Sequence, residues 1–155
     1  MSVAFRRESD EEHKEPRFEL PIPPGLNLVT AAGLKLAERR VAELAAKVAA
    51  ETEELALADA QRSLRYWRTR LATAELAPPP PADEAAFGSR VSFRLNGAER
   101  LVDIVGDDEA DPAAGKIAFS APLARALIGA GPGDFADFGG TTEAIEVVAV
   151  GAIPA

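Results

Sequence analysis

The stretch that decides the fold is residues 105–134, which read VGDDEADPAAGKIAFSAPLARALIGAGPGD. These letters predict the end of a strand, an acidic loop closed by proline and glycine, and a short strand. A helix should follow from Ser120-Ala121-Pro122, because proline is tolerated in the first turn and a serine can cap it. The Gly-Pro-Gly turn at 131–133 ends the helix, so the stretch indicates a small α+β unit.

The flanking residues predict the rest of a sheet. Apolar and polar side chains alternate over 91–95, the pattern of a strand with one buried face. Asn96-Gly97 then supplies a tight hairpin turn. The predicted strands span residues 91–95, 100–105, 117–119, 135–138 and 145–150. The helix at 122–129 should pack on this antiparallel sheet through Leu123, Leu127 and Ile128.

Between Gly33 and Pro78 there is no glycine or proline, which favours helix. Apolar residues at alternating spacings of three and four form two seams: Leu34, Ala37, Val41, Leu44 and Val48, then Leu57, Ala60, Leu64, Trp67, Leu71 and Ala74. On one straight helix, at about 100° per residue, the seams would face opposite sides. We therefore expect an antiparallel coiled-coil hairpin turning near Glu51 and Thr52, capped by Thr30 and Thr52, with a single kinked helix as the alternative.

Proline-rich stretches and changes in composition divide the chain into four parts. Residues 1–26 are charged and then proline-rich, with too little apolar content to pack, so a disordered or extended tail is expected. The hairpin occupies 27–77, and a proline-rich linker follows at 78–86. The C-terminal domain takes 87–155.

Composition restricts the classes of function. No apolar run approaches the roughly 18 residues of a membrane span, and no signal peptide is recognisable, so we expect a cytoplasmic protein. There is no cysteine, and the single histidine, His13, lies in the tail. With no nucleophile, base or phosphate loop in a catalytic pattern, we predict a protein that is not an enzyme, with no catalytic residue and no metal site of its own.

Charge is concentrated in the C-terminal half. Residues 78–155 hold 12 acidic against 5 basic side chains, a net charge of −7, whereas residues 1–77 are nearly neutral. An acidic domain is repelled by nucleic acid, so we expect no independent sequence-specific DNA binding and a basic protein surface as the partner.

Together these features resemble the GreA/GreB family of bacterial transcript-elongation factors, within the wider Gre/Rnk superfamily. The resemblance rests on the 105–134 run, on LVTAAGL at 28–34 and on LATAEL at 71–76, and it covers residues 27–150. It implies an FKBP-like C-terminal domain that binds RNA polymerase at the secondary channel, into which the coiled coil inserts. Ser120, Pro122 and Leu123 match the contact segment of the family, although Ala121 stands where a serine is common.

The hairpin tip departs from the family. Gre factors carry a Gly-Asp-Leu-Ser-Glu-Asn-Ala-like tip whose acids help to hold a Mg²⁺ of the polymerase for transcript cleavage, and that motif is absent here. Glu51, Glu53 and Glu54 are the candidate tip acids, with helix capping as the alternative role. Arms of about 20 residues, or roughly 30 Å, form a shortened coiled coil, so weak or no stimulation of cleavage is expected.

Two charged groups have alternative interpretations. Arg62, Arg65 and Arg68, followed by Arg70, could contact nascent RNA in the polymerase, or form a solvated face paired with Glu38, Glu43 and Asp59. The loop acids lack EF-hand spacing and are expected to be solvated; they are Asp107, Asp108, Glu109 and Asp111.

The resemblance therefore predicts a divergent member of the family that regulates transcription elongation, with RNA polymerase as its partner and no bound cofactor except a Mg²⁺ held by the polymerase. A Rnk-like regulator of nucleoside diphosphate kinase is the alternative. A prolyl isomerase, suggested by the FKBP-like fold alone, is disfavoured because the single Tyr and Trp lie in the hairpin.

Overall fold

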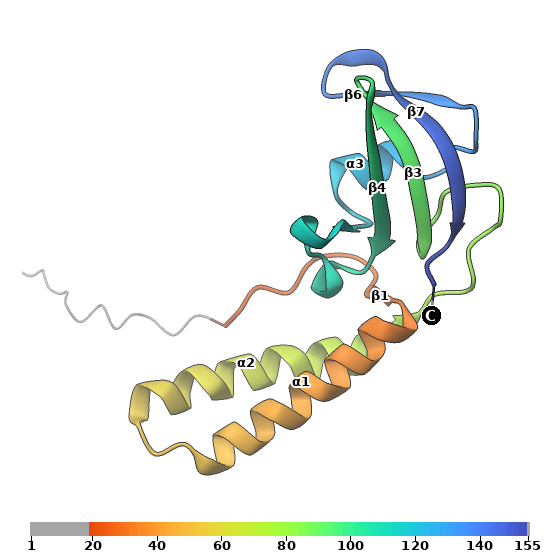
Figure 1. The fold of residues 1–155 in the computed structure, drawn as a ribbon. Helices are drawn as coiled ribbons and strands as arrows, with labels where there is room; N and C mark the ends of the chain where they lie inside the picture. Colours follow the sequence, from red (N-terminus) through yellow and green to blue (C-terminus); the bar gives the residue numbers. More distant parts are fainter. Residues whose placement is uncertain (1–18, 155) are drawn as a thin grey trace, which may run out of the picture.

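The computed structural model describes residues 19–154, which form a helical hairpin and a sheet domain set at an angle to each other (Figure 1). Helix α1 (Ala31–Ala50) and helix α2 (Glu54–Thr73) run antiparallel. The predicted hairpin is thus confirmed, and the single kinked helix is wrong. Residues 19–27 of the predicted tail carry no helix or strand, and the rest of that tail lies outside the described residues.

The C-terminal domain is a five-stranded sheet with one short helix. Its strands are β3 (Ser89–Leu95), β4 (Ala98–Val105), β5 (Lys116–Ala118), β6 (Phe135–Phe138) and β7 (Thr141–Ala152), in the spatial order β5-β4-β3-β7-β6. Every neighbouring pair is antiparallel except β4 with β5, which is parallel. Two 3₁₀ turns, η2 (Asp107–Glu109) and η3 (Pro112–Ala114), connect β4 to β5. The predicted α+β class is confirmed, with one parallel pair in an otherwise antiparallel sheet.

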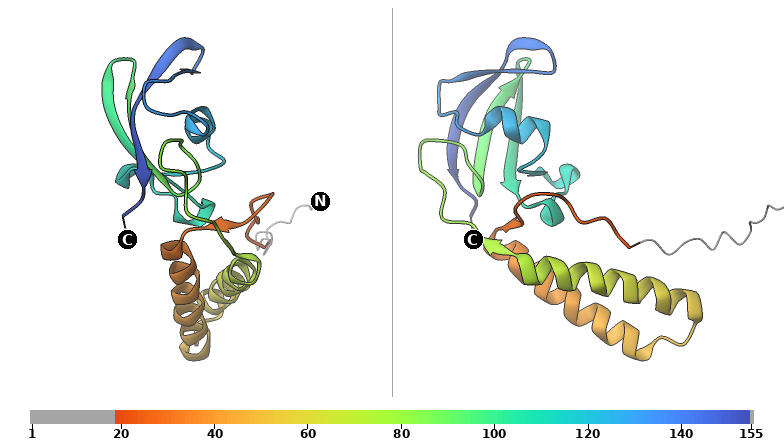
Figure 2. Two further views of the ribbon diagram at one scale, coloured as in Figure 1. Left: turned by 90° about the vertical axis from the view of Figure 1, so that its right-hand side faces the viewer. Right: turned by 180° about the vertical axis from the view of Figure 1, so that it is seen from behind.

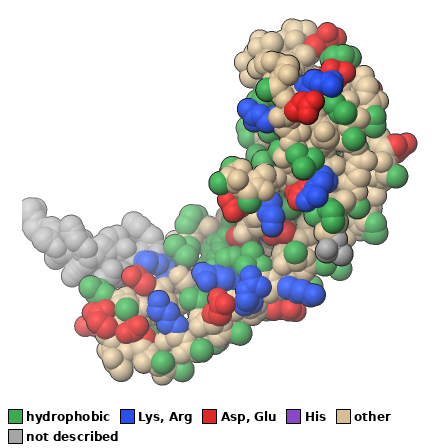
Figure 3. Space-filling view, in the orientation of Figure 1, with side chains coloured by type: hydrophobic (Ala, Val, Ile, Leu, Met, Phe, Trp, Pro, Cys, Tyr) green, Lys and Arg blue, Asp and Glu red, His purple; other side chains and the backbone are tan. Residues whose placement is uncertain are grey.

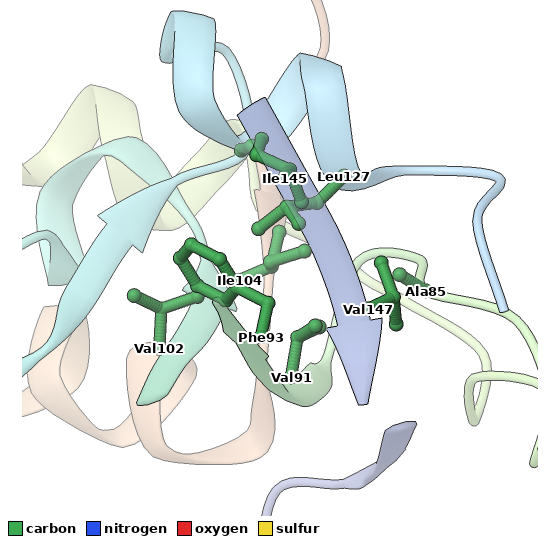
Figure 4. Close-up of a cluster of buried hydrophobic side chains, with 9 residues drawn as sticks. Ala85, Val91, Phe93, Val102, Ile104, Leu127, Ile145 and Val147 are labelled. Atoms are coloured by element: carbon green, nitrogen blue, oxygen red, sulfur yellow. The ribbon is translucent and has the colours of Figure 1, made fainter. Parts of the chain in front are cut away.

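The core lies between the sheet and helix α3 (Pro122–Leu127) (Figure 4). Val91 and Phe93 are fully buried, as the alternation in β3 predicts, and Leu127 meets them from α3. Ile128 was expected to join them, but it is 40% exposed. The helix ends at Leu127, so Ile128 is its C-cap residue and Ala124, fully buried, occupies the inner face instead.

The ends of the hairpin are joined by a second, very small sheet. Strand β1 (Leu28–Val29) precedes α1 and pairs in parallel with β2 (Glu75–Leu76), which follows α2. The backbone N–H of Glu75 donates to the carbonyl of Asn27 over 2.9 Å, and that of Ala77 donates to Val29 over 3.0 Å. Both other views show this pair at the base of the hairpin, beneath the C-terminal domain (Figure 2).

The two helices begin with different caps. The Thr30 side chain accepts from the backbone N–H of Gly33 over 3.0 Å, so the predicted cap of α1 is confirmed. The predicted Thr52 cap is wrong, because α2 begins at Glu54 and its N-cap position is therefore Glu53. Acids and amides cap as well as hydroxyls do, and the Glu53 carboxylate accepts from the N–H of Ala56 over 2.8 Å.

Candidate functional site

The three candidate tip acids all lie at the turn between α1 and α2, but two of them serve the backbone. Glu53 caps α2, and Glu51 accepts a hydrogen bond from the backbone N–H of Glu53 over 3.1 Å. Glu54 is exposed in the first turn of α2, where a carboxylate complements the positive end of the helix dipole. Among residues 19–154, no group of three or more His, Asp or Glu side chains is arranged to hold a metal ion. Of the three tip acids, Glu53 is the one whose side chain caps a helix.

The arginines of α2 are only partly neutralised. Arg62 pairs with Asp59 over 2.8 Å, and Arg65 makes two hydrogen bonds, of 2.8 and 2.7 Å, with Glu19 of the N-terminal segment. Arg68 is exposed and forms no ion pair with any of residues 19–154. On the face shown in Figure 3, Lys and Arg side chains lie in a row along the hairpin, and acidic side chains gather toward its tip.

The sequence missed Glu19 as the partner of Arg65, and two of the three predicted acidic partners were wrong. Within residues 19–154, Glu38 forms no ion pair. Glu43 does not pair with α2; it pairs with Arg40 of its own helix over 3.4 Å. The Arg65 hydrogen bond holds the pKa of Glu19 below its ordinary value, although both side chains are more than half exposed. This contact places Glu19 of the N-terminal segment beside Arg65 of α2.

Residues 120–123, the candidate contact segment, form the start of α3. Ser120 and Pro122 are exposed, whereas Leu123 is partly buried against the core. Ser120 was expected near the helix cap, but Ala121 holds the cap position without a side-chain hydrogen bond. The Ser120 hydroxyl instead donates to Asp107 of η2 over 2.7 Å.

The acidic loop is not the solvated loop that the sequence suggests. Asp107, Asp108 and Glu109 form the η2 turn, and all three are only partly exposed. Asp108 contacts α2 and Glu109 contacts the start of α1, over sequence separations of 38 and 79 residues. Only Asp111 is exposed, as expected.

An apolar groove of about 560 Å³, which the sequence did not predict, lies beside the base of the hairpin. Its lining residues include Ala31, Leu76, Pro78, Pro79, Phe87 and Ile153. The run of prolines at 78–81 was the available signal, but it indicates stiffness rather than a concave surface. The groove offers mainly apolar contact, with Thr30 and Lys35 as polar lining residues.

The two large aromatic residues of the hairpin lie on α2 and away from the sheet. Tyr66 and Trp67 meet edge to face with their ring centroids 5.5 Å apart, and the guanidinium of Arg40 lies 5.5 Å from the Trp67 ring centre. Trp67 packs within the hairpin, whereas the Tyr66 hydroxyl donates a hydrogen bond to Asp108 of η2.

The C-terminal domain matches a known family. Residues 80–152 match the family model described as "Transcription elongation factor, GreA/GreB, C-term". Over 77 residues the chain is 42% identical to transcription elongation factor GreB of Neisseria meningitidis serogroup A, covering 47% of each protein. Over 72 residues it is 39% identical to transcription elongation factor GreA of Brucella canis, covering 44% of this chain and 46% of the relative.

Two solved structures cover more of the chain at lower similarity. Gfh1, a GreA factor homologue of Thermus thermophilus, covers 81% of it with 20% identity and a TM-score of 0.37. A GreA/GreB factor from Nitrosomonas europaea covers 83% with 21% identity and a TM-score of 0.40. Superpositions this loose add nothing to the domain-level match.

Residues 80–152 therefore match the GreA/GreB C-terminal domain, and the family resemblance is confirmed over this part of the chain. The chain spans about half the length of the curated relatives it matches. These matches give no support to the Rnk-like alternative. No helix within residues 19–154 is long and apolar enough to cross a membrane.

Proposed function

We propose that this protein binds RNA polymerase at the secondary channel and regulates transcription elongation from there. The observation that carries the proposal is the GreA/GreB match over residues 80–152, in a chain whose preceding segment folds as an antiparallel helical hairpin. A domain that docks beside a channel and an arm that enters it are the two parts this function needs. A cytoplasmic location follows from this partner.

The docking surface in this proposal is the start of α3. Ser120 and Pro122 are exposed there, and Leu123, partly buried, supports them from beneath. The net charge of −7 on residues 78–155 favours a basic partner surface and speeds association with it.

Within the channel, the hairpin would act more by occupancy than by chemistry. Two of its three tip acids accept hydrogen bonds from backbone N–H groups, and a 20-residue helix is about 30 Å long. A Mg²⁺ held by the polymerase would therefore receive little help from this tip, and transcript cleavage would be stimulated weakly or not at all. Arg62, Arg65 and Arg68 are the residues that would meet nascent RNA, because arginines along a groove neutralise phosphates.

Competition for the polymerase tests the proposal. The full chain should displace labelled GreB from core RNA polymerase at micromolar concentration, and Pro122→Asp should weaken this while leaving the thermal unfolding midpoint unchanged. Ala98→Asp, at an exposed position of β4, serves as the matched control for adding one carboxylate. No displacement by the parent chain would refute the proposal.

A second assay addresses cleavage. In a stalled, backtracked complex we expect little RNA shortening, and no further loss when Glu51, Glu53 and Glu54 are together changed to Gln. Strong cleavage that disappears in this triple variant would show that the tip acids act on the metal despite the backbone contacts of Glu51 and Glu53.

A further inference from the structure

The η2 turn sits where the two parts of the molecule meet, and each of its three carboxylates contacts a different element. Asp107 accepts from Ser120 at the start of α3, over 2.7 Å. Asp108 accepts from α2, and Glu109 accepts from the residue that caps α1. Three consecutive residues thus contact the proposed docking segment and both helices of the hairpin.

The contact with α2 is buried and charged. Asp108 accepts a hydrogen bond from the Arg70 Nε over 2.5 Å and another from the Tyr66 hydroxyl. The Arg70 side chain is only 3% exposed and that of Asp108 only 17%. The Arg70 carbonyl also accepts from the Asn27 amide over 2.7 Å, which ties the same residue to the chain entering the hairpin. An ion pair this far from water keeps its geometry, because separating the charges leaves each one desolvated and unpaired.

The contact with the start of α1 is made by the third carboxylate of the turn, that of Glu109. Glu109 accepts from the backbone N–H of Thr30 over 3.1 Å and from the Thr30 hydroxyl. The same carboxylate accepts from the N–H of Gly106 over 3.1 Å, which closes the turn on itself. Glycine at position 33 makes room for it, since an added Cβ there would overlap the Glu109 carboxylate.

We propose that the acidic turn Asp107–Glu109 is a three-way clamp that sets the direction of the hairpin relative to the docking segment at Ser120. Asp108 and Glu109 are its positioning residues. Because each helix is held by a different carboxylate, the hairpin cannot swing about one contact without breaking the other. The direction of the tip is thereby fixed before any partner is met, which removes an ordering cost from binding.

The relevance of the clamp to transcription rests on the proposed function, but its existence can be tested without polymerase. The chain has no cysteine, so Thr52→Cys at the exposed tip and Ala98→Cys at the start of β4 give one pair of spin-label sites. The start of β4 lies at the end of the domain far from the hairpin (Figure 1). Pulsed electron–electron double resonance then reports the distance between tip and sheet.

We expect one narrow distance distribution in the otherwise unchanged chain. Asp108→Asn with Glu109→Gln should broaden it beyond its original width or move its maximum. Glu84→Gln with Asp111→Asn removes the same charge from exposed positions outside the turn and should leave the distribution unchanged. An unchanged distribution in the Asp108/Glu109 variant would overturn the clamp.

A second variant approaches the same contacts from the hairpin, in case the first one fails to fold. Arg70→Met with Tyr66→Phe removes both side-chain donors to Asp108. Only the Glu109 contact then holds the hairpin, so the distribution should again broaden. Amide hydrogen exchange of β3 and β7 establishes that the sheet is intact in each variant. A narrow, unshifted distribution here would equally refute the proposal.

Competition with GreB separates the two proposals. A parent chain that fails to displace GreB refutes the proposed function and leaves the distance result standing. Both proposals are supported if the parent chain displaces GreB and a variant with a broadened distance distribution displaces it several-fold less well. If a variant with a broadened distance distribution displaces GreB as well as the parent chain does, hairpin direction does not matter for binding. That result overturns the positioning role.

Discussion

Asp108 illustrates how a single carboxylate can decide the position of a buried guanidinium. Removing its charge leaves Arg70, 3% exposed, without an ionic partner. We expect Asp108→Asn to lower the free energy of unfolding by about 3 kcal/mol, as for other buried pairs that lose one member. Urea unfolding measures the change. Asp59→Asn, which breaks the exposed pair with Arg62, should cost no more than about 0.5 kcal/mol, and equal losses at the two sites would contradict this account.

Tyr66 reports the same contact through its ionisation. Burial, and then the hydrogen bond to Asp108, hold its pKa well above the ordinary value of 10.0. Below pH 10 the phenol is neutral in both the folded and the unfolded chain, so its full contribution to stability is present. As the pH rises further, the unfolded chain ionises first, and stability falls.

Tyrosinate absorbance gives a direct measurement, because Tyr66 is the only tyrosine. We expect the folded protein to titrate above free tyrosine, and Asp108→Asn to bring the midpoint down. A parent midpoint at the value of free tyrosine would show that the contact does not persist in solution.

At position 33, helix propensity favours alanine, whereas the contact with Glu109 favours glycine. Alanine is favoured over glycine inside a helix by about 1 kcal/mol, yet an added Cβ here would push against the Glu109 carboxylate. Gly33→Ala should therefore destabilise the parent chain and stabilise the Glu109→Ala variant. A double-mutant cycle by chemical denaturation measures this coupling, and the same sign in both backgrounds would refute it.

Residues that act locally were predictable, whereas residues that act across the fold were not. Thr30 could be assigned as a cap because its acceptor role involves Gly33, only three residues away. Asp108 and Glu109 were expected in solvent because their partners lie 38 and 79 residues distant, and no local pattern encodes such a pairing.

Among the elements, the cap of α2 predicts that substitutions of the neighbouring residues Thr52 and Glu53 differ in their effect on stability. Glu53→Ala removes the side chain that accepts from Ala56, and it should cost about 1 kcal/mol. Thr52→Ala should cost close to nothing, because Thr52 is exposed and precedes the cap position. Thermal unfolding of the two variants side by side measures the difference. A larger loss at Thr52 would mean that the helix starts earlier.

Long, periodic elements followed from the sequence, and short ones did not. The 20-residue helices and β3 show repeating apolar patterns that fix both their type and their buried face. Strands β1 and β2 have two residues each, which is too short for any periodicity, and they exist only because the hairpin brings them together. The sequence predicted that α3 continues to residue 129, because Ile128 is apolar, but the helix ends at Leu127 and Ile128 is its C-cap residue.

For the whole molecule, the uneven distribution of charge predicts how binding responds to salt. With 12 acidic and 5 basic side chains, residues 78–155 should be attracted to a basic partner. We expect the concentration needed to displace GreB from RNA polymerase to rise several-fold between low and physiological ionic strength, because salt screens this attraction. Titrations at a series of salt concentrations measure it. Displacement that strengthens with salt would point to an apolar interface, such as the groove beside Leu76 and Phe87.

The parallel pairing of β1 with β2 has a consequence for how such arms change in length. The chain enters and leaves the hairpin at adjacent points, with Leu28 beside Glu75 and Val29 beside Leu76. The hairpin therefore starts and ends at the same place in the molecule. Adding matched heptads to both helices would lengthen the arm while leaving its base, the clamp and the sheet where they are. Reach is therefore a property that evolution or an engineer can adjust independently of docking.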